Sequence, residues 1–257
     1  SDVQGRLAVG GSTSISLYSV ADQMPAPAAD TLYNATGGGT RTTRDDLVVC
    51  GALVYVSGAV QGGGNLAYTG PAAITPDLAS VYPPGEFRKV DTCPLDFDAL
   101  WWQLDEWSLG LAALPRTGTT VFKYTQLTLK GTLPGVNVFH VSARDLLTVT
   151  ELNLELDAYH PVTNPDTTAV INLLPAEDVS IEGMGFAGLF VDTAFQPHIL
   201  WNLPNAANIT MEYVGFCGSL LAPNATFDFI RGELLGSVWV GAFNGNGQVN
   251  LPAYGYD

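Results

Sequence analysis

The sequence predicts a mainly β protein: a β-solenoid (a parallel β-helix) with roughly triangular coils and one long α-helix packed along its side. Three observations predict this fold: short apolar runs separated by glycine, one segment that recurs after eighteen residues, and a single stretch with helical spacing. The chain has 257 residues, enough to bury a sizeable core. We therefore expect a single domain over residues 1–257.

The β prediction comes from short runs of β-branched and aromatic residues, the types that strands prefer. The 28 glycines indicate many tight turns, because glycine adopts turn conformations at little steric cost. The expected strands include residues 5–11, 47–50, 52–56, 121–124, 127–129, 137–141 and 147–150.

One segment near the end of the chain repeats. Gly218–Ala222 (GSLLA) recurs as Gly236–Val240 (GSVWV), eighteen residues later. This spacing suits one solenoid coil of three short strands and three turns, with each coil stacked on the next.

Residues 95–114 are expected to form the helix. The segment has helical spacing of apolar residues, and Pro94 and Pro115 bound it. Asp96 and Asp98 fall in the first turn, where the helix dipole favours negative charge; calcium ligation is the alternative role. The apolar stripe predicted to face the β body consists of Phe97, Leu100, Leu104, Trp107, Leu111 and Leu114.

Two helix residues, Trp102 and Leu109, point away from this stripe in the expected helix. An exposed tryptophan costs solubility and is often retained for contact. The alternative is that a loop of the same chain covers it. Trp107 is expected to be core because of its helical phase.

A second candidate contact residue is Trp239, which Val238 and Val240 flank. Side chains alternate along a strand, so Trp239 points outward if the valines point inward. The alternative places Trp239 under the helix, as part of the core. Trp102, Leu109 and Trp239 are thus the candidate ligand-binding residues, whereas Trp201 is expected to be core.

Charge excludes several kinds of partner. The net charge is −15, so nucleic acid and anionic membranes would be repelled. No apolar run approaches the roughly 18 residues that span a bilayer, so no membrane insertion is expected. Because cationic side chains are scarce, we expect any ligand to be held by aromatic stacking.

The three cysteines, Cys50, Cys93 and Cys217, allow at most one internal disulfide and leave a buried or intermolecular thiol. Cys50 follows an apolar run and is expected to be buried like a small hydrophobic residue. Candidate glycosylation sites are the sequon asparagines Asn34, Asn208 and Asn224; the alternative is that they are turn asparagines.

No residue pattern predicts an enzyme. A Ser-His-Asp arrangement with a nucleophile turn is missing, as is a Cys/His metal pattern. The glycine triplets at residues 37–39 and 62–64 lack phosphate-loop spacing. His140 and His198 are expected to be structural. We therefore expect no catalytic residue, no metal and no cofactor.

Several motifs, in order along the chain, form a recognisable set: SDVQGRLAVGG (1–11), RDDLVV (44–49), PLDF (94–97), LAALP (111–115), HILWNLPNA (198–206), GSLLAPNA (218–225) and GNG (245–247). Together they resemble choice-of-anchor A domains. The strand that usually precedes the opening motif is absent here, so we expect it to be cleaved, left out of this sequence or donated by a neighbour. The end of the chain, residues 249–254, also departs from the usual pattern.

The resemblance implies a β-helical body with a helix along its side, similar in outline to bacterial ice-binding proteins. Members are bacterial surface adhesins and amoebal Jonah-type cyst-wall lectins that bind cellulose and chitin. We therefore expect a secreted, non-catalytic adhesin- or lectin-like domain at a cell surface or wall. Its partner would be a polysaccharide or another matrix polymer.

Two other functions stay open. One is a structural subunit of an extracellular or viral coat, wall or fibre, on a virion surface in the viral case. Such a subunit would assemble with copies of itself by strand addition. The other is ice binding, which needs a flat array of threonines. The sequence offers only Thr117 with Thr119 and Thr148 with Thr150.

Overall fold

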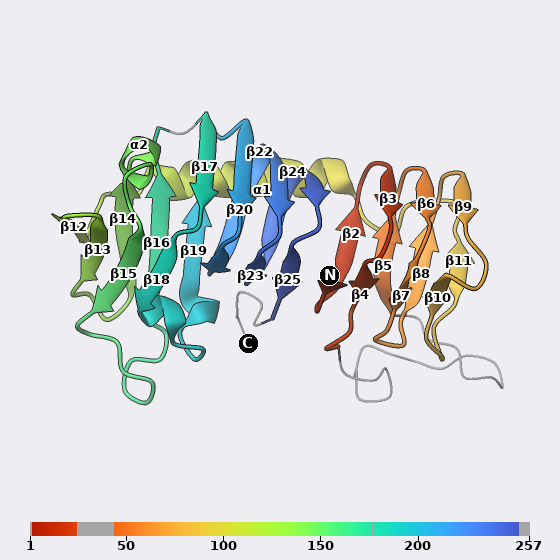
Figure 1. Ribbon diagram of the computed structural model, residues 1–257, viewed down its shortest axis with the longest axis horizontal. Helices are drawn as coiled ribbons and strands as arrows, with labels where there is room; N and C mark the ends of the chain where they lie inside the picture. Colours follow the sequence, from red (N-terminus) through yellow and green to blue (C-terminus); the bar gives the residue numbers. More distant parts are fainter. Residues whose placement is uncertain (1, 25–43, 176, 252–257) are drawn as a thin grey trace. The chain divides into compact units, whose positions relative to one another are not determined.

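The protein is mainly β and contains several parallel sheets, as the sequence predicts (Figure 1). The computed structural model describes residues 2–24, 44–175 and 177–251. Within those ranges α1 (Phe97–Ala112) is the one helix of seven residues or more. It lies inside the predicted range and is two residues shorter at each end.

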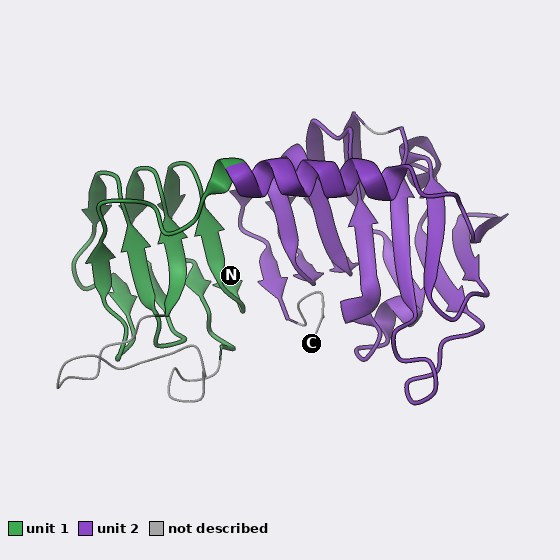
Figure 2. Ribbon diagram, turned by 180° about the vertical axis from the view of Figure 1, so that it is seen from behind, with its two compact units in different colours: residues 1–98 green, residues 99–257 purple. Residues whose placement is uncertain are grey.

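The chain divides into two compact units, residues 1–98 and 99–257 (Figure 2). The division falls within α1, after Asp98. That the two units form a single domain stays a prediction.

Unit 1 contains three parallel sheets, ordered β2–β5–β8–β11, β3–β6–β9 and β1–β4–β7–β10. Leu47 pairs with Leu66, and Leu66 with Phe87, which are steps of 19 and 21 residues. The strands are β1 (Asp2–Val3), β2 (Leu7–Val9), β3 (Thr13–Ile15), β4 (Ser19–Val20), β5 (Asp45–Val49), β6 (Leu53–Tyr55), β7 (Gly58–Val60), β8 (Asn65–Tyr68), β9 (Ala72–Ile74), β10 (Ala79–Val81) and β11 (Phe87–Lys89).

The core of unit 1 is built from alternate residues of these strands. Because side chains alternate across a strand, one set from each strand packs inward. The fully buried members of this core include Val20, Leu47, Val49, Leu53, Tyr55, Val60 and Leu66.

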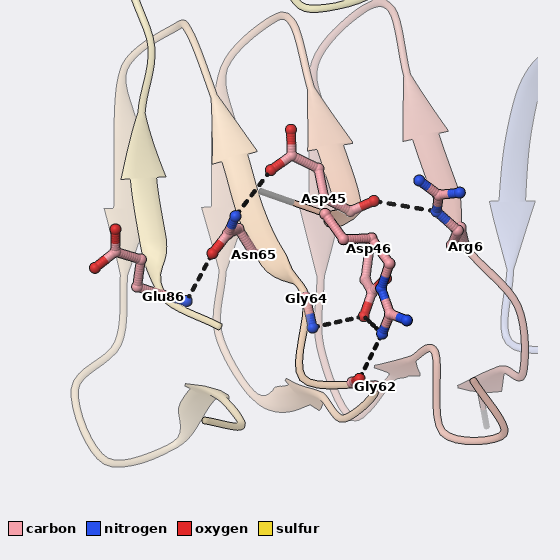
Figure 3. A network of polar contacts seen from close by, with 8 residues as sticks. Arg6, Asp45, Asp46, Gly62, Gly64, Asn65 and Glu86 are labelled. Atoms are coloured by element: carbon pink, nitrogen blue, oxygen red, sulfur yellow. Dashed lines mark hydrogen bonds and ion pairs between the residues drawn. The ribbon is translucent and has the colours of Figure 1, made fainter. Parts of the chain in front are cut away.

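A buried ion pair in unit 1 binds the glycine turn that precedes β8 (Figure 3). Arg44 Nε lies 2.8 Å from Asp46 Oδ1, and both side chains are buried. Arg44 Nη2 also donates to the Gly62 carbonyl at 2.5 Å, and the Gly64 amide donates to Asp46 Oδ2 at 2.8 Å. The RDDLVV motif is therefore joined to residues 62–64. A Cβ at Gly64 would collide with the Asp46 carboxylate.

The neighbouring carboxylate, Asp45, faces a different set of partners. It accepts two hydrogen bonds from Arg88 Nη2, at 2.7 and 2.8 Å, and one from Asn65 Nδ2 at 3.2 Å. Arg6 donates to the Asp45 carbonyl (Figure 3). Asp45 thus binds side chains of β8 and β11, whereas Asp46 binds the turn before β8, although the two residues are adjacent in sequence.

The cysteines form one disulfide, between Cys50 and Cys93, and leave Cys217 free and buried. The prediction of one bond and one buried thiol is confirmed. The prediction for Cys50 is wrong, because Cys50 is half-buried and bonded. Burial, with the nearby Glu233, raises the pKa of the Cys217 thiol to about 11, so this thiol is protonated at neutral pH.

Unit 2 is also built on parallel strands. Its sheets are β12–β13–β15–β18, β21–β23–β25, and a larger sheet in which β22 joins β14–β16–β19 to β20–β17 and also pairs with β24. Among the described strands of unit 2, only β12 runs antiparallel to its neighbour. The elements are β12 (Thr119–Lys123), β13 (Gln126–Gly131), β14 (Val136–Val141), α2 (Ala143–Leu146), β15 (Glu151–Leu156), β16 (Thr168–Leu173), β17 (Asp178–Glu182), β18 (Gly185–Gly188), β19 (Ile199–Asn202), β20 (Asn208–Glu212), β21 (Gly215–Cys217), β22 (Ser219–Ile230), β23 (Glu233–Leu235), β24 (Val238–Gly245) and β25 (Gln248–Asn250).

The eighteen-residue repeat is confirmed as a structural repeat. Leu220 pairs with Val238, and Ala222 with Val240, on the adjacent strands β22 and β24. Trp201 is buried as predicted, and its ring stacks on Phe190 with centroids 5.7 Å apart.

One predicted strand, residues 147–150, is wrong. These residues form the turn between α2 and β15. The local cause is side-chain capping: Ser142 Oγ accepts from the Arg144 amide, and Thr148 Oγ1 donates to the Asp145 carbonyl. Such local hydrogen bonds compete with strand pairing.

Candidate binding surface

Helix α1 is bound to the large sheet of unit 2 by hydrogen bonds. Ser108, the one fully buried helix residue, donates to Asn202 Oδ1 at 2.5 Å, and Asn202 Nδ2 donates back to the Ser108 carbonyl at 2.8 Å. Asn202 Nδ2 also donates to Asn172 Oδ1, and Asn172 Nδ2 donates to the Leu111 carbonyl at 2.8 Å. The two asparagines are paired neighbours on β16 and β19.

The helix and the segment just after it contact successive strands at every third residue. The four contacts are His140 on β14 with Leu114, Asn172 on β16 with Leu111, Asn202 on β19 with Ser108, and Asn224 on β22 with Asp105. Three helical residues rise about 4.5 Å, close to the roughly 4.8 Å between neighbouring strands. The helix axis therefore crosses the strands, as Figure 2 shows.

This docking confirms half of the predicted apolar stripe and corrects the other half. Phe97, Leu104 and Leu111 are half-buried, close to Ser108 around the helix axis. Trp107, expected in the core, is 55% exposed, and Leu100 and Leu114 are exposed as well. The prediction assumed an apolar interface, whereas the sheet presents asparagine side chains, so the small polar Ser108 is the buried residue and Trp107 lies on one flank.

One flank carries the two helix residues predicted for ligand binding. Trp102 is 66% exposed and Leu109 is 51% exposed. They are seven residues apart, which is about two helical turns, so they lie on the same side of α1. Trp107 lies about 140° away around the axis, on the opposite flank. We call Trp102 and Leu109 the Trp102 flank.

The position of Trp102 is supported by its neighbour. Trp101 Nε1 donates to the Pro223 carbonyl on β22 at 3.2 Å, which ties that ring to the sheet. The Trp102 ring meets Trp101 edge-on, with centroids 4.7 Å apart. Trp102 therefore presents an exposed ring from an anchored support, which lowers the entropy lost when a ligand binds.

Trp239, the third candidate, lies elsewhere. It is half-buried. Asn172, Asn202, Leu221 and Trp239 pair in this order across the neighbouring strands β16, β19, β22 and β24, so their side chains lie on one face of the sheet. Val238 and Val240 pack against the core. Trp239 thus points to the face that α1 covers, as its alternation with the valines requires.

The sequon asparagines can be placed for two of three sites. Asn208 opens β20 and donates to Asp178, whereas Asn224 lies within β22 and donates to Asp105 at 2.7 Å. Both are exposed and neither is a turn residue, so the turn alternative is wrong for them. Asn34 lies outside the described residues. Glycosylation stays a prediction.

The described residues contain no group of three or more His, Cys, Asp or Glu side chains arranged to hold a metal ion. None of the helices in the described ranges combines the length and the hydropathy that a membrane span requires.

We expect the Asn202→Leu variant to lose about 2–3 kcal/mol of folding stability. The change leaves buried partners on Ser108 and Asn172 without their hydrogen bonds, and each orphaned buried polar group costs about 1–3 kcal/mol. Urea unfolding followed by circular dichroism measures the loss. Asn208→Leu is the control, because this exposed asparagine should change stability by about 0.5 kcal/mol or less. Equal losses of folding stability in both variants would contradict a stabilising role for Asn202 between α1 and the sheet.

Comparison with known proteins gives one match. A family model described as "Putative Ice-binding-like adhesive domain" matches residues 1–251. Neither the curated proteins nor the solved structures contain a match to this chain.

Proposed function

Because this chain belongs to the family of ice-binding-like adhesive domains, we propose that it is a non-catalytic, lectin-like adhesin that binds a polysaccharide or another surface polymer outside the cell. The observation that carries the proposal is the exposed, anchored aromatic ring of Trp102 on α1. A sugar ring presents an apolar face that stacks on tryptophan. The finer assignment, to choice-of-anchor A domains, is part of the same proposal.

We also propose that each unit is a β-solenoid. The support is parallel pairing between strands one coil apart: Leu47 with Leu66 in unit 1, and Leu220 with Val238 in unit 2. A stacked fold of this kind offers long, rigid faces, which suit an extended polymer better than a small solute.

The charge of the chain narrows the class of polymer. A net charge of −15 repels anionic chains, whereas neutral polymers such as cellulose and chitin avoid that repulsion. Binding by stacking releases few counterions, so salt should weaken it little.

A retention assay tests the proposal. The protein is mixed with insoluble cellulose, chitin or collagen, and the bound fraction is measured at low and high salt. We expect Trp102→Ala to lower retention on the glycan that binds the wild type. Its stability should change by about 0.5 kcal/mol or less, as for a surface substitution.

Two controls use the other tryptophans. Trp107→Ala removes another exposed tryptophan from the opposite flank and should leave retention unchanged. Trp201→Ala removes a core ring and should cost roughly 3–5 kcal/mol. If Trp102→Ala is retained like the wild type, the Trp102 flank is not the binding surface. Failure of the wild type to bind any polymer would contradict the function itself.

The alternative of assembly by strand addition has weaker support. The chain has three lysines, and Lys89 and Lys123 lie on β11 and β12, the end strands of their sheets. Lysine on an edge strand discourages pairing with another chain.

Ice binding also has weaker support. Three of the four threonines that it would use form side-chain hydrogen bonds within the protein. Thr117 Oγ1 accepts from the Val138 amide, Thr148 Oγ1 donates to the Asp145 carbonyl, and Thr150 Oγ1 donates to Thr125.

A further inference from the structure

A shallow pocket of about 420 Å³ lies at one corner of unit 2, on residues that the proposed function does not use. Its lining comes from the turn between β20 and β21, the turn between β22 and β23, and the start of β25. The lining residues are Tyr213, Val214, Gly215, Arg231, Gly232, Glu233 and Gln248.

Two of these residues have an unfavourable backbone. Tyr213 has φ 52° and Arg231 has φ 50°, both in the left-handed region that side chains normally avoid. One coil earlier the equivalent position is Gly183, with φ 58°. The positions are equivalent because the preceding residues, Glu182, Glu212 and Ile230, pair across β17, β20 and β22. Glycine adopts this turn without strain.

Burial does not offset the strain at Tyr213 and Arg231. Tyr213 is 53% exposed, and the Arg231 side chain is 61% exposed. The Arg231 guanidinium lies over the Tyr213 ring, 4.7 Å from its centroid, and 3.5 Å from Glu212. Exposed contacts of these kinds add little to stability. Residues that keep a strained backbone without a gain in stability are typical of functional sites.

A positive φ by itself does not mark a binding residue. Tyr124, in the turn between β12 and β13, has φ 56° and is 94% exposed, and it does not line the pocket. Tyr213 and Arg231 differ because they stack on each other and border the same concave surface. That surface also contains the Glu233 carboxylate, which accepts from Asn250 Nδ2 at 3.3 Å, and the side chain of Gln248.

These groups match the chemistry of a sugar. A guanidinium donates hydrogen bonds, a carboxylate accepts them, and a primary amide and a phenol do both. Adjacent hydroxyls of a sugar ring need such mixed partners, and an aromatic ring supplies a face for the C–H groups. One arginine beside two carboxylates, Glu212 and Glu233, leaves the site net negative, which disfavours acidic sugars.

We propose that Tyr213, Arg231, Glu233 and Gln248 form a binding site for one or two neutral sugar units. This inference rests on the proposed function, because it names a second place where the same polymer would be held.

The test is a titration of the full chain with cellotetraose and with chitotetraose, followed by amide NMR shifts. We expect one of the two to shift the amides of Gly215 and Gly232. Tyr213→Gly and Arg231→Gly should each weaken that binding at least tenfold. Their melting temperatures should stay within a few degrees of the wild type or rise, because glycine relieves the left-handed backbone.

The matched control is Tyr124→Gly, which removes an exposed tyrosine from a similar backbone outside the pocket and should bind like the wild type. If Tyr213→Gly melts early, Tyr213→Asn replaces it, because asparagine tolerates the left-handed region. Wild-type affinity in Tyr213→Gly or Tyr213→Asn would overturn the inference.

The retention assay separates this inference from the function. If the wild type is retained on cellulose or chitin and the Tyr213 variants bind as well, the pocket assignment is wrong and the proposed function stands. If the wild type binds neither the insoluble glycans nor the tetrasaccharides, both are wrong.

Discussion

The Asp46→Ala variant is expected to lose about 3–5 kcal/mol of folding stability. The change removes the Asp46 carboxylate from the buried Arg44 guanidinium, whose Nε lies 2.8 Å from it. It also removes the acceptor for the Gly64 amide in the turn before β8. Urea unfolding, monitored by far-ultraviolet circular dichroism, measures the loss as a lower midpoint.

The neighbouring residue is the matched control for this variant. Asp45 also pairs with an arginine, Arg88, but the Arg88 side chain is 38% exposed. Water can therefore solvate Arg88 after Asp45→Ala, and the loss should be about 1 kcal/mol. If the two variants lose the same stability, burial of the Arg44–Asp46 pair is not what makes it important.

The second large effect is expected from the disulfide. Cys50 and Cys93 are 43 residues apart in sequence, and closing a loop of that length lowers the entropy of the unfolded chain. The chain-entropy relation gives about 4 kcal/mol for this separation. We therefore expect the double variant Cys50→Ala, Cys93→Ala to unfold at a clearly lower urea concentration than the wild type.

Reduction supplies the control. A reducing agent should lower the unfolding midpoint of the wild type to near that of the double variant, and should leave the double variant unchanged. Cys217 is buried and carries a pKa of about 11, so it should not exchange with the reagent in the folded state. If the reductant leaves the unfolding midpoint of the wild type unchanged, a stabilising role for this bond is contradicted.

Local patterns in the sequence determined where several elements lie. The proline-bounded segment became α1, and β-branched runs such as residues 121–124 and 137–141 became strands. The recurrence of GSLLA as GSVWV determined which residues pair on β22 and β24. The same eighteen-residue step separates Tyr213 from Arg231, so it was a usable signal for the corner pocket, although no motif marks either residue.

Other features depend on partners far apart in the chain, and only the tertiary structure decided them. Helical periodicity placed Leu104 and Leu111 near the sheet-facing side of α1, where they are half-buried. It did not predict that Asn172 and Asn202 would select Ser108 as the buried residue and leave Trp107 exposed. Three cysteines leave the pairing open until Cys50 and Cys93 are brought together. The sequence by itself determined the helix, the repeat and part of the strands, because these follow from the local order of residues. The tertiary structure decided which side chains face the solvent, because that depends on the side chains that the fold places opposite them.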